Sequence, residues 1–238
     1  MNDLSFDPTD LEAMLWASRR PDYLSAWHGH VAFAHWLVDI AHPGCIVELG
    51  TEHGVSYASF CHATAARGRF AKCFAIDTWQ GDDHTGTYSD AVFDDLNIFN
   101  QTHYGFFSML LRMRFEDAVA GFDDGSIDLL HIDGLHTYDA VRNDFLTWLP
   151  KVSARGVVLF HDTAIRDKDF GVWKLWAELS DRYPSFRFDH SAGLGVLLVG
   201  PNQPAKLRAL CALGDSPMAA LVRANFELFS ALAQRVSA

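Results

Sequence analysis

The sequence predicts an α/β fold, in which helices cover both faces of a mostly parallel sheet. The main observation is the stretch of residues 126–163, which reads as strand, helix and strand. Its two apolar runs, residues 127–132 and 157–160, are continuous rather than alternating, which is typical of strands buried on both faces. A short glycine-containing hairpin signal, Ser191-Ala192-Gly193, indicates that the sheet finishes with an antiparallel pair.

Apolar runs and turn residues predict the elements in order. The expected strands cover about residues 45–49, 72–76, 107–113, 127–132, 157–160, 185–190 and 194–199. The first helix is expected to begin at Thr9 or Asp10 and to be stopped by Pro21. A further helix is expected in the periodic segment that follows residue 132. The other helices are expected over about residues 24–40, 55–66, 89–101, 114–121, 172–183, 205–213 and 218–236. We therefore expect an N-terminal helical extension (1–43), a core (44–200) with an insertion at 80–105, and C-terminal helices (201–238).

Length and composition limit the class of protein. A chain of 238 residues suits one α/β domain with extra helices. The net charge of −11 argues against a nucleic-acid backbone or an anionic membrane surface as the main partner. Four scattered cysteines without CxxC or zinc-like spacing indicate a reducing compartment. Because no signal peptide or membrane-length apolar run is evident, we expect a cytoplasmic location.

Polar residues follow two of the expected central strands. Asp133, Gly134 and His136 come after the first, and His161, Asp162 and Thr163 come after the second. Because ligands of open parallel sheets bind beyond the carboxyl ends of the strands, these groups are expected to converge on a hydroxyl group, a metal ion or both. The plainer alternative is that each Asp caps a helix and each His is a hydrogen-bonded structural residue.

The first core strand ends in a glycine turn with the pattern ExGxxxGxS. Gly50 permits a tight turn, and Gly54 lets the next helix start against the sheet with a free N-terminus facing the crevice. The pattern is not the dinucleotide GxGxxG. Glu48 inside the strand end favours a positively charged ligand and would repel a pyrophosphate.

The second strand ends in Asp77, at the position where nucleoside-binding units hold ribose hydroxyls, although a strand-end Asp can also simply make a turn. Trp79 is a candidate for stacking on a base. The polar stretch 80–101 that follows is typical of a lid or acceptor site. Within it, Asp82, Asp83 and His84 form either a metal cluster or a solvated loop.

These motifs together resemble the class I S-adenosylmethionine-dependent methyltransferases. The resemblance covers about residues 44–200 and rests on ELGTEHGVS, AIDTW, HIDGLHTY and the terminal hairpin. The run DLLHIDGLHTYDAVRNDFLTWL, followed by RGVVLFHDT, is similar to the branch of macrolide sugar O-methyltransferases and cephalosporin hydroxylases, whose relatives accompany bacterial glycosyltransferases. It implies a Rossmann-like, doubly wound seven-stranded sheet, S-adenosylmethionine as cofactor, and O-methylation of a sugar or related hydroxyl, often assisted by a divalent metal.

The resemblance also implies roles for single residues. Glu48 and Gly50 would lie against the methionine part of the cofactor, Asp77 would hold the ribose, and Glu116 or Asp117 would lie near the adenine. The full set of implied cofactor contacts is Glu48, Gly50, Thr51, Ser56, Asp77, Thr78, Trp79, Glu116 and Asp133.

For chemistry, the resemblance matches Asp133 to the family's metal-binding acid and His136 to a histidine proposed as general base in some members. Where the family commonly has two acids after the next strand, this chain has His161 and Asp162. Asp162 still fits a metal ligand, but an imidazole disfavours magnesium, which prefers oxygen. Manganese, iron or zinc would accept the set Asp133, His161 and Asp162, and a metal-free enzyme is an open alternative.

Other functions stay open at this point. A nicotinamide-dependent oxidoreductase fits the first strand, turn and acid loosely but lacks GxGxxG, and no oxygenase triad of two histidines and a carboxylate is evident. A catalytically silent cofactor-binding partner of a glycosyltransferase is a third reading. The expected acceptor is a small molecule or glycan, and a homo-oligomer is a further option.

Overall fold

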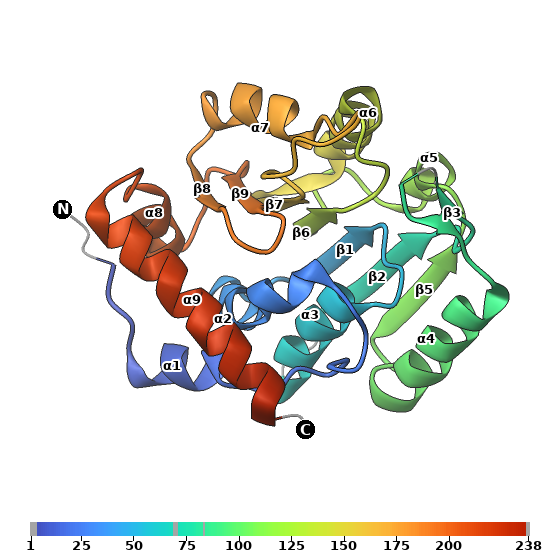
Figure 1. Ribbon diagram of the computed structural model, residues 1–238, viewed down its shortest axis with the longest axis horizontal. Helices are drawn as coiled ribbons and strands as arrows, with labels where there is room; N and C mark the ends of the chain where they lie inside the picture. Colours follow the sequence, from blue (N-terminus) through green and yellow to red (C-terminus); the bar gives the residue numbers. More distant parts are fainter. Residues whose placement is uncertain (1–3, 69–70, 83, 237–238) are drawn as a thin grey trace.

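A seven-stranded sheet lies between two layers of helices in the computed structural model, which describes residues 4–68, 71–82 and 84–236 (Figure 1). The strand order is β5-β2-β1-β6-β7-β9-β8. The strands are β1 (Cys45–Leu49), β2 (Lys72–Asp77), β5 (Ser108–Arg112), β6 (Ile127–Ile132), β7 (Val152–His161), β8 (Ser185–Phe188) and β9 (Leu194–Leu198). The first five strands in this order, β5, β2, β1, β6 and β7, pair in parallel. Strand β9 pairs antiparallel with both β7 and β8. This confirms the predicted Rossmann-like fold class.

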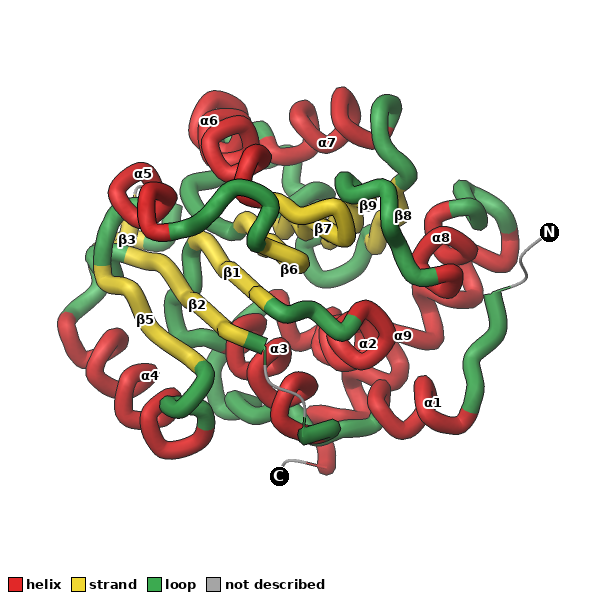
Figure 2. The backbone as a smooth tube through the Cα atoms, turned by 180° about the vertical axis from the view of Figure 1, so that it is seen from behind, coloured by secondary structure: helices red, strands yellow, loops and turns green. Residues whose placement is uncertain are grey.

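The two helical layers pack on opposite faces of the sheet (Figure 2). One face of the sheet is covered by α5 (Phe115–Ala118), α6 (Tyr138–Trp148) and α7 (Val172–Ser180). The other core includes residues of α1 (Pro8–Met14), α2 (Val31–Ala41), α3 (Val55–Ala66), α4 (Asp90–His103), α8 (Ala205–Cys211) and α9 (Pro217–Val236). The first and last helices of the described chain therefore share one layer with α3.

Short elements complete the structure. A small antiparallel ladder of β3 (Gly81–Asp82) and β4 (Gly86–Thr87) lies in the predicted insertion. Short 3₁₀ helices are η1 (Ala26–His30), η2 (Val119–Gly121) and η3 (Leu149–Lys151). Within the described residues, no helix combines the length and apolar character needed to cross a membrane.

Several element boundaries differ from the sequence prediction, and the first helix, expected to run to Pro21, ends at Met14. Asp7, not Thr9 or Asp10, caps α1, because its carboxylate accepts the N–H groups of both residues and Pro8 occupies the first helical position. The expected helix at 24–40 begins as the 3₁₀ turn η1 before α2. Strand β7 begins at Val152 rather than 157, since it continues past a register irregularity opposite Ile127 and Leu129.

Candidate active site

A cavity of about 540 Å³ opens at the carboxyl ends of β1, β2, β6 and β7. This is the edge at which open parallel sheets bind ligands, beside the point where the strand order reverses between β1 and β6. The predicted site residues that line it are Gly50, Thr51, Ser56, Asp77, Thr78, Glu116, Asp133, His136, His161 and Asp162.

The turn after β1 brings two strand ends very close together. Gly50 has φ +84°, and a Cβ atom there would lie 2.2 Å from the carbonyl oxygen of Asp133. The Asp133 N–H in turn donates to the Leu49 carbonyl at 2.8 Å. Only glycine therefore allows the β1 turn to pass the end of β6. Beyond it, Gly54 and Ser56 place the first turn of α3 at the cavity wall.

Asp77 organises the same turn through its carboxylate. Oδ2 accepts the N–H groups of Thr51 at 2.9 Å and Glu52 at 3.1 Å, and Oδ1 accepts that of Trp79 at 2.8 Å. A carboxylate can accept about four hydrogen bonds, so one direction at Oδ1 remains. Thr51 Oγ1 is buried and has no hydrogen-bond partner among the described residues. Both groups fit a hydroxyl-rich nucleoside.

Glu48 lies behind the cavity wall, in contrast to the predicted cofactor contact. It is fully buried, with Oε2 2.8 Å from Nδ1 of His131. Trp27 Nε1 donates to His131 Nε2 at 3.2 Å, so the imidazole carries its proton on Nδ1 and donates it to Glu48. Burial raises the pKa of Glu48, partly offset by hydrogen bonds from His131 and Ser56. The alternation of strand side chains explains this, because Val47 and Leu49 occupy the opposite face.

Trp79 also departs from its predicted role. Its ring is 0% exposed, contacts Phe93, and is held by a hydrogen bond from Nε1 to the Glu52 carbonyl at 2.9 Å. The residue adopts φ +50° directly after the Asp77 turn, which directs the ring under the loop. A base could therefore not stack on Trp79 in this conformation.

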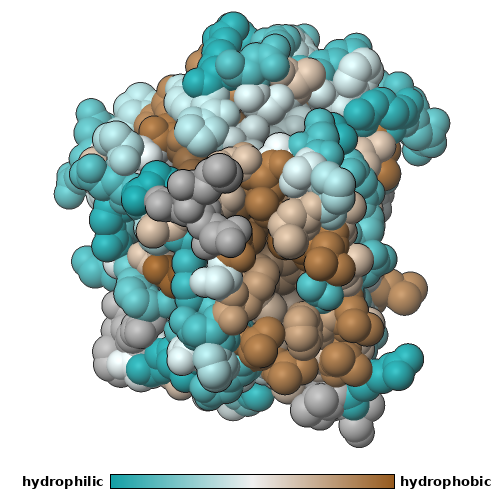
Figure 3. Space-filling model, turned by 90° about the vertical axis from the view of Figure 1, so that its left-hand side faces the viewer, coloured by the Kyte–Doolittle hydropathy of each residue, from teal (hydrophilic) through white to brown (hydrophobic). Residues whose placement is uncertain are grey.

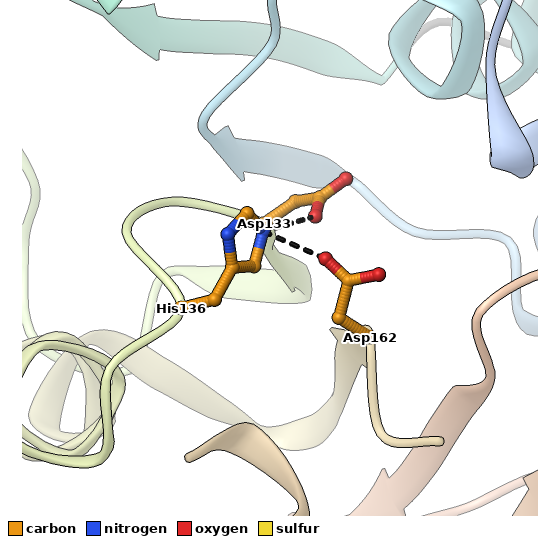
Figure 4. A group of neighbouring side chains, drawn as sticks. All are labelled: Asp133, His136 and Asp162. Atoms are coloured by element: carbon orange, nitrogen blue, oxygen red, sulfur yellow. Dashed lines mark ion pairs between the residues drawn. The ribbon is translucent and has the colours of Figure 1, made fainter. Parts of the chain in front are cut away.

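An acid and imidazole cluster occupies the ends of β6 and β7 (Figure 4). His136 Nε2 lies 2.8 Å from Asp162 Oδ2 and 3.5 Å from Asp133 Oδ1. One ligand atom from each of these three residues lies within 4.8 Å of the others. Asp162 adopts φ +59°, a conformation that non-glycine residues adopt mainly where the surrounding structure imposes it.

His161 supports this cluster from one side. Its Nδ1 lies 3.2 Å from Asp133 Oδ1 and 3.4 Å from Asp162 Oδ1, while Nε2 lies 3.2 Å from the Ser191 carbonyl. Since a carbonyl only accepts, Nε2 carries a proton there, and Nδ1 donates toward the acids. The sequence predicted Asp133, His161 and Asp162 as metal ligands. In the structure, the imidazole whose ligand atom lies within 4.8 Å of those of Asp133 and Asp162 is that of His136.

Charges in the cluster compensate one another. Burial alone would lower the pKa of both imidazoles, but Asp133 and Asp162 outweigh it and raise the pKa to about 9 for His136 and about 10 for His161. Burial would raise the pKa of Asp133, yet His161 and His136 lower it below its usual range. Two imidazolium and two carboxylate groups thus form a neutral set. Two carboxylates and an imidazole would also suit a divalent ion that accepts oxygen and nitrogen ligands.

The insertion and the loop after β7 supply residues that hold His136. His84 Nδ1 lies 3.3 Å from His136 Nδ1, and His84 Nε2 lies 2.8 Å from Asp169 Oδ1. Both imidazoles stack on Phe170, with ring centroids 4.5 and 4.9 Å away. From the sequence, His84 was expected with Asp82 and Asp83 either in a metal cluster or in a solvated loop. Asp83 lies outside the described residues, and Asp82 instead accepts the N–H of His84 at 2.8 Å.

The N-terminal segment forms another wall of the cavity. Residues 24–27 line the cavity, and Leu24 at its rim is 98% exposed. Tyr23 stacks on His53 with 4.8 Å between ring centroids and donates its hydroxyl to Asp95 at 2.6 Å. These contacts join segments that are distant in sequence, so periodicity carries no signal for them.

Comparison with known proteins identifies the family. Residues 47–163 match a family model described as a methyltransferase domain. The fold is similar to the O-methyltransferase TomG from Streptomyces achromogenes, solved with SAM, at a TM-score of 0.55 and 18% identity over 83% of this chain and 92% of that one. SAH-bound methyltransferase PaMTH1 from Podospora anserina gives a TM-score of 0.53 and 18% identity over 83% and 90% of the two chains. These matches show a methyltransferase domain at residues 47–163 and the fold of the class I SAM-dependent methyltransferases.

A curated relative of this chain is much longer. The uncharacterized protein y4gI of Sinorhizobium fredii (strain NBRC 101917 / NGR234) is 49% identical over 176 residues, which are 74% of this chain and 19% of that protein. The chain thus spans about a fifth of the relative's length. Neither the matched family model nor these two solved structures support the nicotinamide alternative.

Proposed function

We propose that this methyltransferase transfers the methyl group of S-adenosylmethionine to a hydroxyl oxygen of a sugar or related acceptor, assisted by a divalent metal. The observation that carries the proposal is the cluster of Asp133, His136 and Asp162, which faces the same cavity as the glycine turn and Asp77. A cofactor site and a proton-accepting site within one cavity are what methylation of a weakly acidic hydroxyl requires.

The cofactor half of the cavity comprises the ends of β1 and β2. Asp77 has an acceptor direction left for a ribose hydroxyl, and Thr51 Oγ1 has no hydrogen-bond partner among the described residues. Glu116 lines the cavity at its outer side, where it would approach the adenine. Glu48 acts indirectly in this scheme, because it fixes His131 and Ser56 from behind the wall. When bound, the cofactor supplies a methyl group already activated by the sulfonium.

The acceptor half comprises the ends of β6 and β7. His136 is the proposed base, because its Nε2 lies at the cavity between two carboxylates that stabilise the imidazolium formed when it takes the acceptor proton. With a pKa of about 9, His136 is protonated at neutral pH in the absence of other charges. Asp133 and Asp162, with Nδ1 of His161, would hold a divalent ion, whose charge would acidify an acceptor hydroxyl and favour the neutral form of His136, which can then take the proton.

The remaining walls support a polar acceptor. Asp82, Thr85 and Tyr88 from the insertion and His53 from the β1 turn line the cavity and offer both donors and acceptors. A hydroxyl-rich molecule would satisfy such groups better than an apolar one. Similarity to the sugar O-methyltransferase branch extends the proposal to glycans as acceptors and to a glycosyltransferase as a partner protein.

A methyl-transfer assay tests the proposal. The chain is incubated with isotopically labelled S-adenosylmethionine, a panel of nucleotide sugars and glycans, and magnesium, manganese, iron, zinc or a chelator, and products are measured by mass spectrometry. We expect a labelled methyl ether on one acceptor class. Thermal shift with S-adenosylmethionine and with NAD runs in parallel. Binding of the former without transfer to any acceptor would favour a catalytically silent partner protein.

A further inference from the structure

The outer side of α9 is apolar along the helix, although it faces solvent. Its inner side packs into the core through Ala219, Val222, Phe226 and Ala233, which are at most 3% exposed. A surface helix normally presents polar residues on the opposite side. Here Leu221 is instead 54% exposed and Leu228 is 56% exposed.

The outer residues follow the spacing of a coiled-coil seam. They alternate at intervals of four and three residues and are all exposed: Pro217, Leu221, Ala224, Leu228, Ala231 and Arg235. This is the a and d spacing by which one helix packs against another. Because the inner side already satisfies packing within the chain, the outer seam is not needed for the fold. Figure 3, viewed from the side where α8 lies in Figure 1, shows hydrophobic residues gathered over a broad area of this part of the surface.

We propose that this seam, the α9 seam, binds the α9 seam of a second copy of the chain in antiparallel orientation. Large and small side chains alternate along it, with Leu221 and Leu228 separated by Ala224. Antiparallel pairing about residue 226 places Leu221 opposite the partner's Ala231 and Leu228 opposite the partner's Ala224. Each leucine then fills the space above an alanine. A parallel pair would set leucine against leucine and alanine against alanine.

The charges at the two ends favour the same orientation. Asp215 precedes α9 with a fully exposed side chain, 3.8 Å from Arg223 of its own chain, and Arg235 is exposed in the last turn. Antiparallel pairing brings the partner's Arg235 to Asp215 and opposes the helix dipoles. Glu227, on the flank of the seam, has its carboxylate 3.9 Å from His190 Nδ1 of its own chain. A net charge of −11 opposes self-association elsewhere on the surface, so local pairing of opposite charges matters here.

Sedimentation velocity of the full chain over a wide concentration range tests the seam. We expect a concentration-dependent dimer, and in the variant L221D/L228D a dissociation constant raised by about a hundredfold or more, since each charge would be buried without a partner. The matched control is Ile98→Asp, a 68% exposed residue on α4, which should leave the dimer intact. A monomeric wild type, a dimeric L221D/L228D, or an equally weakened control would each overturn the proposal. Co-sedimentation of a monomeric wild type with lipid vesicles would also overturn the proposal, because the α9 seam would then bind a membrane surface.

Exchanging a small and a large side chain on the α9 seam tests the antiparallel orientation of the two helices without adding charge. Ala224→Leu should weaken the dimer by steric overlap and Leu228→Ala by loss of contact, while A224L/L228A should restore it to within about threefold of wild type, because the opposed positions again pair large with small. Circular dichroism melting checks that each variant folds. Folded single variants that associate like wild type, or a folded double variant as weak as the singles, would overturn the antiparallel pairing.

Discussion

At the end of β2, the carboxylate of Asp77 is surrounded by three backbone N–H groups, whereas at the ends of β6 and β7 Asp133 and Asp162 are surrounded by imidazoles. Backbone amides are fixed dipoles whose state does not change with pH. Imidazoles exchange protons near neutrality, and in this cluster their pKa values are raised to about 9 and 10. One half of the cavity is therefore built for constant recognition, and the other for a charge state that responds to ligands.

The carboxylates of Asp77, Asp133 and Asp162 are held at the cavity in two different ways. In the β2 half, two of the hydrogen bonds to Asp77 come from the turn after β1 and one comes from the turn that follows Asp77, so the backbone of two neighbouring strand-end turns makes the site. In the β6 and β7 half, the groups belong to different strands and loops, and each holds its neighbour's charge. Variants in the first half should change cofactor affinity, and variants in the second should change turnover.

The largest effect is expected for His136→Ala. Removing the proposed base should lower turnover by about a hundredfold to ten thousandfold, with cofactor affinity near wild type, because the β1 and β2 turns are untouched. Steady-state kinetics and calorimetric titration with S-adenosylmethionine measure the two quantities. His103→Ala, in the last turn of α4, is the control that should change neither. Equal loss of affinity and turnover would mean that His136 is a structural residue.

Asp77→Ala should give the reverse pattern. Loss of a charged acceptor that holds both the turn and a ribose hydroxyl should weaken S-adenosylmethionine binding by about ten- to a hundredfold. In the same titration, Glu116→Ala should weaken binding less, and Asp117→Ala should leave it unchanged, because only Glu116 of the two lines the cavity. Unchanged affinity in Asp77→Ala would remove the ribose assignment.

Much of the framework was predictable from local patterns. Continuous apolar runs at 127–132 and 157–160 indicated central parallel strands, and Gly50 indicated the close turn that the structure shows beside Asp133. The polar residues after those strands, including His136 and Asp162, were expected to converge, and they lie 2.8 Å apart. Such features depend on strand ends and turns, which sequence encodes directly.

Side-chain direction and distant partners were not predictable in the same way. Glu48 was expected in the cleft, but strand alternation turns its side chain to the face where His131 and Trp27, a residue of the N-terminal segment, enclose it. His84 meets Asp169 across 85 residues, and no periodic pattern links them. These contacts arise from tertiary packing of loops and added helices, where local propensity carries little information.

A pH series should sharpen the contrast between the halves. The pKa values of His136 and His161 are raised above the usual value near 6.5, so their ion pairs stabilise the fold fully below about pH 6.5 and lose that contribution as pH rises through about 9 and 10. For chelator-treated protein, wild type should therefore exceed His136→Gln in melting temperature at pH 6.5, and the difference should shrink by pH 10. Asp77→Asn should show no such narrowing over this range. A constant difference for His136→Gln would argue against the charged cluster.

The smallest effect is expected for His84→Ala. His84 contributes one hydrogen bond and one stacking contact to the arrangement around His136, so its loss should lower turnover by about two- to tenfold, the range of one net hydrogen bond. Affinity for S-adenosylmethionine should stay at wild type, because His84 touches no residue of the β1 or β2 turns in the described contacts. His84→Gln keeps a polar side chain and should recover part of the turnover, whereas Asp169→Ala, which removes only the partner of His84, should lose less than His84→Ala. A loss in His84→Ala as large as that in His136→Ala would place His84 in the chemistry itself rather than behind it, and the division between the two halves of the cavity would have to include the insertion.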